Sequence, residues 1–515
     1  MKRVLLVLVG ALGDLAWRKF LDAAKAIEST NPDVAIMLVD IGWGAAEVSL
    51  ADELRWRIAR RRIELYAEDI AAKKVKDIQL KSGLGSMQFP WNIDEFFEPC
   101  LSGKPEALES QRKALHSEVD DWLQYFTESS SAGLTRYQSE FEKIHDELER
   151  LKQEGWKISL LVATPPQAYL RVIEQWSSVA DRILLEKPAG CLNPQTLSYA
   201  GTEQLRLVAG QIRPPAQIAT NDHYNSKLIV RIMDRVRDYR LFDALLEPAR
   251  IKRIVVQLME IAPLPSGRYG FYNGAGGAFG DMVPHLLQAV RAILGIPPTE
   301  LKIDFQKFYW ARYNIPVFSA PPSGSPYCYE PHYYQPLSPE TETFVAFKAV
   351  LEVKGNLIPL YCRTGKGTPD PAKTLRIDTQ YGDTDADVVS LIFAMNENCV
   401  TLRDDYKQFI MGTGPITLAE PFQSGVPLVD TDANLTEYKS VFDALTKSEW
   451  TGDALEKRYF PDVDQAAELS DLIFEKLVTE RSQSRVVSTY LINDDESFAA
   501  IDNFLDDEAH WGQVL

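Results

Sequence analysis

The chain has 515 residues, of which 45% are hydrophobic and 10% aromatic, and this length predicts two or three domains with sizeable cores. The formal net charge of -18 argues against nucleic acid or an anionic membrane as the main partner. The five cysteines are scattered and lack metal-ligand spacing, so we expect a reducing compartment and no metal site. No run of about 18 apolar residues occurs, and we expect a cytoplasmic protein without a membrane span.

Strand and helix signals alternate through the first two hundred residues. Four mostly apolar runs predict strands, and they lie within residues 4–10, 34–43, 157–166 and 181–190. Continuous apolar runs are typical of parallel strands that are covered on both faces. We therefore predict an α/β unit at residues 1–208, a doubly wound Rossmann domain that binds a dinucleotide.

The pattern changes in the second part of the chain, residues 209–515. Long strand-like segments follow one another without intervening helices, at residues 342–353, 356–365 and 387–396. This arrangement favours an antiparallel sheet. The last part of the chain has a mainly helical pattern. We predict an α+β domain with a large, mostly antiparallel sheet, which binds the substrate and forms the contacts between subunits.

A glycine turn follows the first predicted strand, in the sequence GALGDLAWRKF at residues 10–20. A strand, a tight turn and a helix N-terminus together form an anion site, because free backbone N–H groups and the helix dipole face the ligand. The spacing G-x-x-G matches the common dinucleotide fingerprint only in part. From these residues alone, a pyrophosphate loop and an ordinary strand-to-helix turn both stay open.

Three charged residues follow predicted strands. Asp40 ends the second run, where an acid hydrogen-bonds the adenosine ribose and favours NAD over NADP, although a turn aspartate fits as well. Lys187, in LLEKPAG, can hold a substrate oxygen and favour developing negative charge, or it lies in a surface turn. Lys366, in YCRTGKGT, can close over an anionic substrate or be a solvated turn charge.

Two further segments carry histidines at helical spacing. In TNDHYNSK, His223 and Lys227 are four residues apart, which suits a phosphate site or an ordinary capped helix start. In GGAFGDMVPHLLQ, Asp281 and His285 are four residues apart. A histidine beside an acid is a candidate general base, and a buried structural histidine is the alternative.

Taken in order, these motifs resemble those of glucose-6-phosphate dehydrogenase. GALGDLAWRKF resembles the G-A-S-G-D-L-A-x-R-K loop of that family, LLEKPAG its E-K-P-F-G, and NDHYNSK its D-H-Y-L-G-K signature. HLLQ, TETFVAFKAVLE followed by RTGK, and ATPP resemble three further family motifs. The resemblance implies a Rossmann domain with an α+β domain, and oxidation of glucose 6-phosphate at C1 to 6-phosphogluconolactone.

The resemblance also implies a role for each candidate residue. His285 would take the proton of the C1 hydroxyl, Asp222 would orient His285, and Lys187 would hold the sugar oxygen. Substrate contacts would come from His223, Tyr224, Lys227, Glu260, Asp281 and Lys366. Cofactor contacts would come from Gly10, Leu12, Gly13, Asp14, Leu15, Lys19, Asp40, Thr164, Pro165 and Lys187.

Three departures from the family pattern leave the cofactor and the substrate open. Thr220 replaces the arginine that opens the D-H-Y signature, and DIGWGAA lacks the arginine that binds the 2′-phosphate, so the cofactor is NAD or NADP. The spacing of Asp281 and His285 is four residues instead of five, which resembles the Gfo/Idh/MocA sugar oxidoreductases. The alternatives are an enzyme of that kind acting on another sugar or carbon, or an inactive homologue. The resemblance implies a sugar-phosphate partner and a homodimer or homotetramer.

Overall fold

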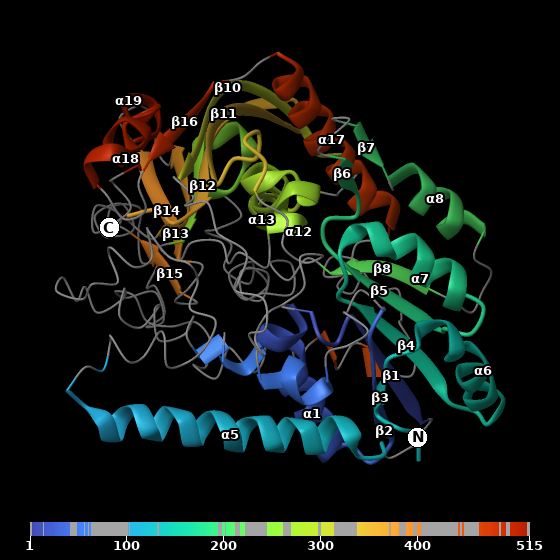
Figure 1. Cartoon of the computed structure of the whole chain (residues 1–515). Coiled ribbons are helices and arrows are strands. Elements are labelled where there is room, and N and C mark those ends of the chain that lie inside the picture. The colour runs from blue at the N-terminus through green and yellow to red at the C-terminus, as the bar shows by residue number, and fades with distance from the viewer. Residues whose placement is uncertain are drawn as a thin grey trace, which may run out of the picture.

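In the computed structural model, the described residues form two large sheets, each covered by helices, and one two-stranded hairpin (Figure 1). The structure describes residues 3–13, 15–41, 49–55, 57–59, 61–62, 101, 103–130, 133–193, 198–200, 202–211, 217–221, 245–260, 269–296, 300–313, 337–369, 372–380, 388–394, 399–402, 441–442, 445–446, 463–483, 486–490 and 495–511.

The first sheet has six strands, all parallel, in the order β3-β2-β1-β4-β5-β8. The strands are β1 (Val4–Val9), β2 (Val34–Val39), β3 (Tyr137–Gln138), β4 (Lys157–Val162), β5 (Arg182–Glu186) and β8 (Gln217–Asn221). Every residue of β1 and β2 is buried, as the apolar runs predict for central parallel strands. This strand order is that of the Rossmann fold, and the prediction of a doubly wound N-terminal unit is confirmed.

Helices cover both faces of this sheet. They are η1 (Ala16–Phe20), α1 (Leu21–Thr30), α5 (Pro105–Thr127), η2 (Phe141–Lys143), α6 (His145–Gln153), η3 (Pro166–Ala168), α7 (Tyr169–Trp176) and α8 (Thr202–Gln211). Side chains alternate along β1: Leu6 and Leu8 pack with α1 and α5, whereas Leu5 and Val7 pack with α6 and α7. Two separate hydrophobic cores therefore lie on opposite faces of one sheet.

The first sheet extends past residue 208, the predicted boundary of the N-terminal domain. β8 pairs in parallel with β5, and the pairing places Asn221 opposite Glu186. Residues 217–221 therefore belong to the dinucleotide-type sheet instead of the second domain. The short hairpin β6 (Cys191–Asn193) and β7 (Ser198–Ala200) follows β5.

The second sheet has eight strands in the order β15-β14-β13-β9-β12-β11-β10-β16. They are β9 (Ile251–Glu260), β10 (Lys302–Tyr313), β11 (Phe344–Val353), β12 (Asn356–Lys366), β13 (Ala372–Gln380), β14 (Val388–Ala394), β15 (Cys399–Leu402) and β16 (Val487–Tyr490). β9 with β12 and β10 with β16 are parallel pairs, and the other pairs are antiparallel. The predicted large, mostly antiparallel sheet is confirmed, whereas β16 is a strand in a region expected to be mainly helical.

One face of the second sheet is covered by α12 (Tyr269–Ala275) and α13 (Gly277–Leu294), while η4 (Pro248–Arg250) precedes β9. α13 contacts β9, β11 and β12. Its apolar side chains, including Phe279, Val283 and Leu286, join the core of this sheet with Ile254 and Val256 of β9. The polar residues that α13 carries are therefore held on a helix whose position is fixed by packing.

The C-terminal residues lie against the opposite face of the second sheet. α18 (Asp495–Asp502) and α19 (Asp506–Ala509) follow β16. Arg253 Nη1 donates to the Glu508 carbonyl oxygen over 2.6 Å, and Arg376 Nη1 donates to the His510 carbonyl oxygen over 2.8 Å. The Arg363 guanidinium lies 4.9 Å from the centre of the Trp511 ring. Cationic side chains of three strands thus fix the C-terminal segment on the sheet.

The Glu508 side chain adds a pH-dependent contact to this segment. Hydrogen bonds from Lys348, and then from Lys307, lower the pKa of Glu508 to about 2 from its ordinary 4.5. A lowered pKa in the folded state stabilises the fold above pH 4.5, and this contribution is lost as the pH falls toward 2.

We expect Glu508→Gln to lower the free energy of unfolding at pH 7 and to lower it less at pH 3, because pH 3 lies between the two pKa values of Glu508, where part of its contribution is already lost. Urea unfolding of both proteins at the two pH values measures this difference. Glu352→Gln is the control, since Glu352 forms an exposed pair with Lys302. An equal loss at pH 7 and pH 3 would show that the Glu508 charge does not contribute.

Candidate functional site

The carboxyl ends of β1 and β4 form the switch point of the first sheet, where doubly wound folds bind their ligands. Gly10 N–H donates to the Val39 carbonyl oxygen over 2.8 Å, and Ala163 N–H donates to the Val9 carbonyl oxygen over 2.9 Å. Gly13 N–H donates to the Gly10 carbonyl oxygen over 2.8 Å. The loop after β1 is therefore a tight turn, which η1 and α1 continue.

Two glycines of this loop leave no room for a side chain. A Cβ atom on Gly10 would lie 2.9 Å from the Ala163 carbonyl oxygen, and Gly10 has a φ of +84°. A Cβ atom on Gly13 would lie 2.9 Å from the Gly10 carbonyl oxygen. The loop after β1 therefore packs directly on the turn after β4, with the close backbone approach that a pyrophosphate loop needs.

Thr164 adds a polar group at the same switch point. Its side chain is buried, and its hydroxyl has no hydrogen-bond partner among the residues that the structure describes. Since a buried hydroxyl without a partner is costly, a ligand at this point would satisfy it. Together with the Gly10 turn, this hydroxyl fits a dinucleotide at the position predicted for Thr164 and Pro165.

We expect Gly10→Ala to raise the dissociation constant of the nicotinamide cofactor about tenfold or more, since the new methyl group displaces the loop from Ala163. Gly155→Ala is the matched control, because Gly155 also has a positive φ, of +88°, but has open space around it. Fluorescence titration with NAD and NADP measures binding. Equal affinities in the two variants would contradict a cofactor role for the loop.

Asp40 lies directly after β2, and a second carboxylate is close to it. Asp40 N–H donates to the Gln138 carbonyl oxygen over 3.0 Å. Burial raises the pKa of Glu53 from its ordinary value, Arg57 at 2.9 Å opposes that increase, and the charge of Asp40 adds to it. The sequence singled out Asp40 alone, and Glu53 was missed because its helix carries many charges without a distinguishing pattern.

Lys187 and Asp281 form an ion pair between the two parts of the chain. Lys187 Nζ lies 2.7 Å from Asp281 Oδ1 and 2.5 Å from the Asp281 carbonyl oxygen. The side chains are 15% and 6% exposed, so water screens the pair only weakly. Lys187 follows β5 at the carboxyl edge of the first sheet, and Asp281 lies on α13. The pair therefore connects the sheet that is predicted to bind the cofactor to the domain that is predicted to bind the substrate.

His285 lies one helical turn after Asp281 on α13, and Gln288 follows one turn later. All three are buried to at least nine-tenths, on a helix that is otherwise mostly apolar. Arg291 Nε donates to Gln288 Oε1 over 2.6 Å, which fixes the orientation of the Gln288 amide. The predicted helical placement of Asp281 and His285 is confirmed, whereas Gln288 and Arg291 were not predicted.

Lys366 and Glu260 lie opposite each other at the ends of the parallel strands β12 and β9. Lys366 Nζ donates to Glu260 Oε2, and Lys373 Nζ lies 3.5 Å from Glu260 Oε1. Two lysines of the described residues thus contact one carboxylate. Lys373 was not predicted, because neighbouring strands in space are not neighbours in the sequence.

Glu342 is another residue that the sequence did not reveal. It lies just before β11 in the chain, and its side chain lies beside the N-terminus of α13. Its Oε1 accepts a hydrogen bond from Phe279 N–H over 3.0 Å, and Arg481 Nη2 lies 3.5 Å from its Oε2. The side chains of Glu342 and Arg481 are 0% and 1% exposed. A fully buried carboxylate therefore caps the helix that carries Asp281 and His285.

Several predicted site residues lie outside the described part of the chain. They are Asp14, Asp222, His223, Tyr224 and Lys227, together with the side chain of Lys19. Asn221, which precedes Asp222 in the sequence, pairs with Glu186, which precedes Lys187. Leu12 is buried in the loop after β1, and Leu15 is half-buried at the N-cap of η1.

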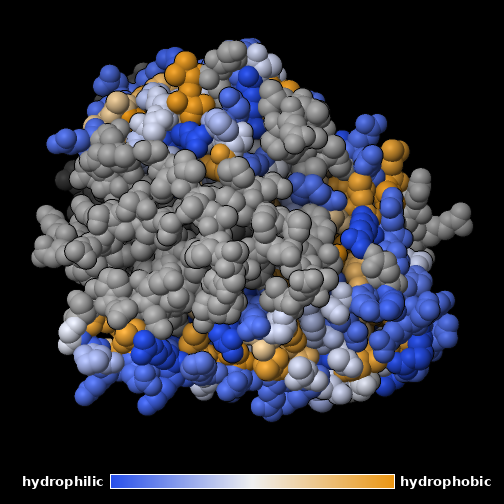
Figure 2. Space-filling view, in the orientation of Figure 1, coloured by the Kyte–Doolittle hydropathy of each residue, from blue (hydrophilic) through white to orange (hydrophobic). Residues whose placement is uncertain are grey.

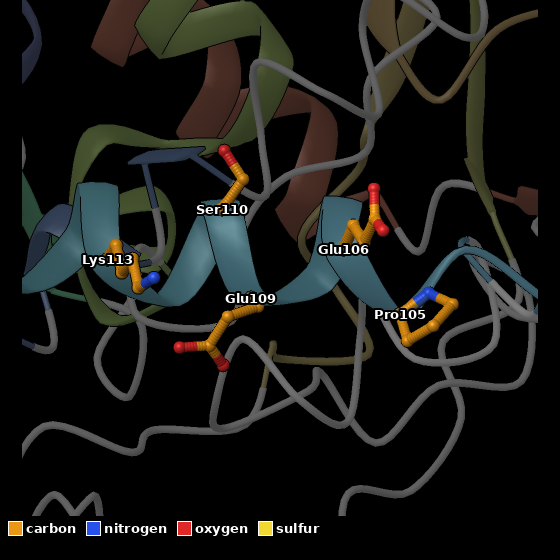
Figure 3. A pocket seen from close by; sticks show the side chains of 5 residues that line it. All are labelled: Pro105, Glu106, Glu109, Ser110 and Lys113. Atoms are coloured by element: carbon orange, nitrogen blue, oxygen red, sulfur yellow. The ribbon is translucent and has the colours of Figure 1, made fainter.

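A hollow elsewhere lies along the first turns of α5, lined by Pro105, Glu106, Glu109, Ser110 and Lys113 (Figure 3). It contains none of the candidate residues. Hydrophilic side chains of α5 and α6 dominate the lower edge of the molecule in Figure 2, with apolar groups between them.

Within the described residues, no three His, Cys, Asp or Glu side chains are grouped to hold a metal ion. None of the described helices is both long and apolar enough to cross a membrane.

Neither the known protein-family models nor the curated proteins match this sequence. Solved structures do match. Glucose-6-phosphate 1-dehydrogenase from Mycobacterium avium aligns over 98% of this chain and 97% of its own, with a TM-score of 0.56 and 14% identity. A glucose-6-phosphate dehydrogenase in complex with glucose 6-phosphate aligns over 99% and 98%, with a TM-score of 0.55 and 15% identity. An oxidoreductase from Sinorhizobium meliloti aligns over 94% and 99%, with a TM-score of 0.49 and 12% identity.

The chain has the fold of the glucose-6-phosphate dehydrogenases. The alignment with these two structures runs through both sheets, so the likeness is to the whole two-part architecture. The resemblance that the ordered motifs indicate is confirmed at the level of the fold.

Proposed function

We propose that the protein is an NAD(P)-dependent dehydrogenase of a hexose phosphate, with oxidation of glucose 6-phosphate at C1 to 6-phosphogluconolactone as the first candidate reaction. The Lys187–Asp281 ion pair carries this proposal. It brings the carboxyl edge of a dinucleotide-type sheet against the helix that holds His285. A sugar at this pair would have a hydride acceptor on one side and a proton acceptor on the other.

The chemistry follows from the residues on each side. His285 would take the proton of the hydroxyl group, with Asp222 orienting its ring, while the bound nicotinamide supplies the hydride acceptor. Lys187 Nζ would donate a hydrogen bond to the reacting oxygen and stabilise the negative charge that develops there. Asp281 and Glu260 would accept hydrogen bonds from other sugar hydroxyls.

The phosphate group would bind at a cationic position. Lys366 and Lys373 both contact Glu260, and two ammonium groups at one sheet edge support an anion there. His223, Tyr224 and Lys227 complete the proposed phosphate site through the resemblance of the D-H-Y signature. An acidic protein can bind a sugar phosphate in this way because the charge that matters is local.

The cofactor preference is proposed to be NAD. Asp40 lies at the strand end where the adenosine ribose binds in Rossmann folds, and Glu53 places a second carboxylate near it. The Asp40 carboxylate at this position would repel the 2′-phosphate of NADP. The absence of an arginine from DIGWGAA supports the same preference.

The direct test is a substrate and cofactor screen. The purified protein is mixed with glucose 6-phosphate and NAD or NADP, and reduced cofactor is followed by absorbance. We expect turnover with glucose 6-phosphate, faster with NAD, and none with unphosphorylated glucose. No turnover with any hexose 6-phosphate would reject the proposal and leave a catalytically inactive homologue or another substrate.

A second candidate is an enzyme of the Gfo/Idh/MocA kind acting on a sugar without a phosphate group. The four-residue spacing of Asp281 and His285, together with the Lys187 pair, favours it. In that case Lys227 would not contact substrate. Unchanged activity in Lys227→Ala would favour this candidate, and a raised KM for the sugar phosphate would favour the first.

A further inference from the structure

One helix, α17 (Val463–Ser482), packs into the cores of both parts of the chain. It lies between α8 and α13 (Figure 1) and contacts both, as well as β7 and β8. Val463 and Ala466 belong to the hydrophobic core of the first sheet. Later residues of α17, including Phe474 and Leu477, belong to the core of the second sheet.

Polar contacts hold α17 against α8 and against the cap of α13. Arg206 Nη1 on α8 donates to Asp471 Oδ2 over 2.6 Å. Near the other end, Arg481 forms the buried pair with Glu342, which caps α13. The position of α13 relative to the first sheet therefore depends on contacts made through α17 as well as on the Lys187–Asp281 pair.

The Phe474 ring lies next to glycines in both segments that carry this pair. Its Cε2 atom lies 3.5 Å from the position that a Cβ would take on Gly190, three residues after Lys187. Its Cε1 atom lies 3.2 Å from the corresponding position on Gly276 and 3.5 Å from that on Gly280, which directly precedes Asp281. Phe474 is 1% exposed.

Glycine at these three positions leaves room for the ring between the two segments. A side chain at two of them would also meet other atoms: a Cβ on Gly280 would lie 1.7 Å from the Ala275 carbonyl oxygen, and one on Gly190 would lie 2.7 Å from Thr202 Cγ2. The size of the Phe474 ring thus bears on the distance between the turn after Lys187 and the start of α13. Because packed interiors transmit small displacements, a change in this distance would also move Lys187 relative to Asp281.

We propose that Phe474 is a positioning residue, whose ring sets the spacing between Lys187 and Asp281 and so aligns the substrate with the cofactor. This inference rests on the proposed function, because the alignment matters only if hydride and proton leave the sugar on opposite sides of the pair. Phe474 itself lies behind the glycines and acts through their backbone. A misplacement of about 1 Å can cost about 10²-fold in rate.

The kinetic test compares Phe474→Leu with Phe141→Leu. Phe141 is 1% exposed in the core of the first sheet, where its ring packs against Trp176 of α7. We expect kcat to fall about tenfold or more in Phe474→Leu, with little change in the KM of the sugar phosphate and in cofactor affinity. Phe141→Leu should lower the unfolding midpoint similarly and keep kcat. Equal kcat values in the two variants would overturn the proposal.

A chemical readout decides the positioning role even if the wild-type protein has no turnover. A carbodiimide joins a lysine amine to a carboxylate that it contacts, and peptide mass spectrometry measures the Lys187–Asp281 product. The Lys366–Glu260 product in the same digest is the internal standard. A lower ratio of the two products in Phe474→Leu but not in Phe141→Leu supports the proposal, and an unchanged ratio overturns it. Failure of the proposed function is read separately, from the substrate screen.

Discussion

His285→Asn is expected to lower kcat by about 10²–10⁴-fold while cofactor affinity stays at the wild-type level. Asparagine is close in size and keeps a hydrogen-bonding group, but it cannot accept a proton at neutral pH. His285 lies on α13, which contacts the second sheet, and the nicotinamide would bind at the carboxyl edge of the first sheet. The substitution therefore removes the proposed base without disturbing the loop at Gly10.

Steady-state kinetics and a cofactor titration measure the two quantities. His145→Asn is the control, since the His145 side chain lies 3.0 Å from the Gln175 carbonyl oxygen on the α6 side of the first sheet. That variant should keep its full turnover. Near-normal turnover in His285→Asn would remove His285 from the mechanism, and a loss of cofactor binding would indicate a wider structural change.

Glu342→Ala is expected to lower the free energy of unfolding by about 3–5 kcal/mol. The variant leaves Arg481, whose side chain is 1% exposed, as a buried charge without the carboxylate that faces it. It also removes the acceptor of the Phe279 N–H bond at the start of α13. Breaking one partner of a buried pair is costly because the other charge stays out of water.

Urea unfolding at pH 7 measures the loss, and Glu352→Ala is the control from the same strand region. Glu352 pairs with Lys302, and the two side chains are 42% and 68% exposed. Exposed pairs of this kind contribute about 0–1 kcal/mol. A similar small loss in Glu342→Ala would show that Arg481 finds other partners and that the cap does not stabilise α13.

Much of the first sheet could be predicted because its strands are continuous apolar runs. Buried parallel strands such as β1 and β2 have no polar face, and this makes them distinct from helices and from half-exposed strands. The glycine loop could be recognised because only glycine fits at Gly10. Lys187 was identified by its place after a strand, and His285 by its spacing from Asp281.

The contacts that complete the site could not be predicted from local patterns. Lys187 and Asp281 are 94 residues apart, and Glu342 and Arg481 are 139 residues apart. No periodicity in either segment specifies such a partner. The position of α17 could not be predicted either. The helix is buried against two different cores, so its sequence has no single apolar stripe that indicates what it packs on. β16 was missed since a short strand at a sheet edge has a weak signal.

The place of α17 in both cores has a consequence for the order in which the protein can be completed. A nascent chain emerges from its N-terminus, and early domains commonly fold before later ones are synthesised. Here Val463 and Ala466 close part of the first core, so that core stays incomplete until α17 has been made. Until then the newly made chain carries apolar surface of the first sheet that α17 later covers.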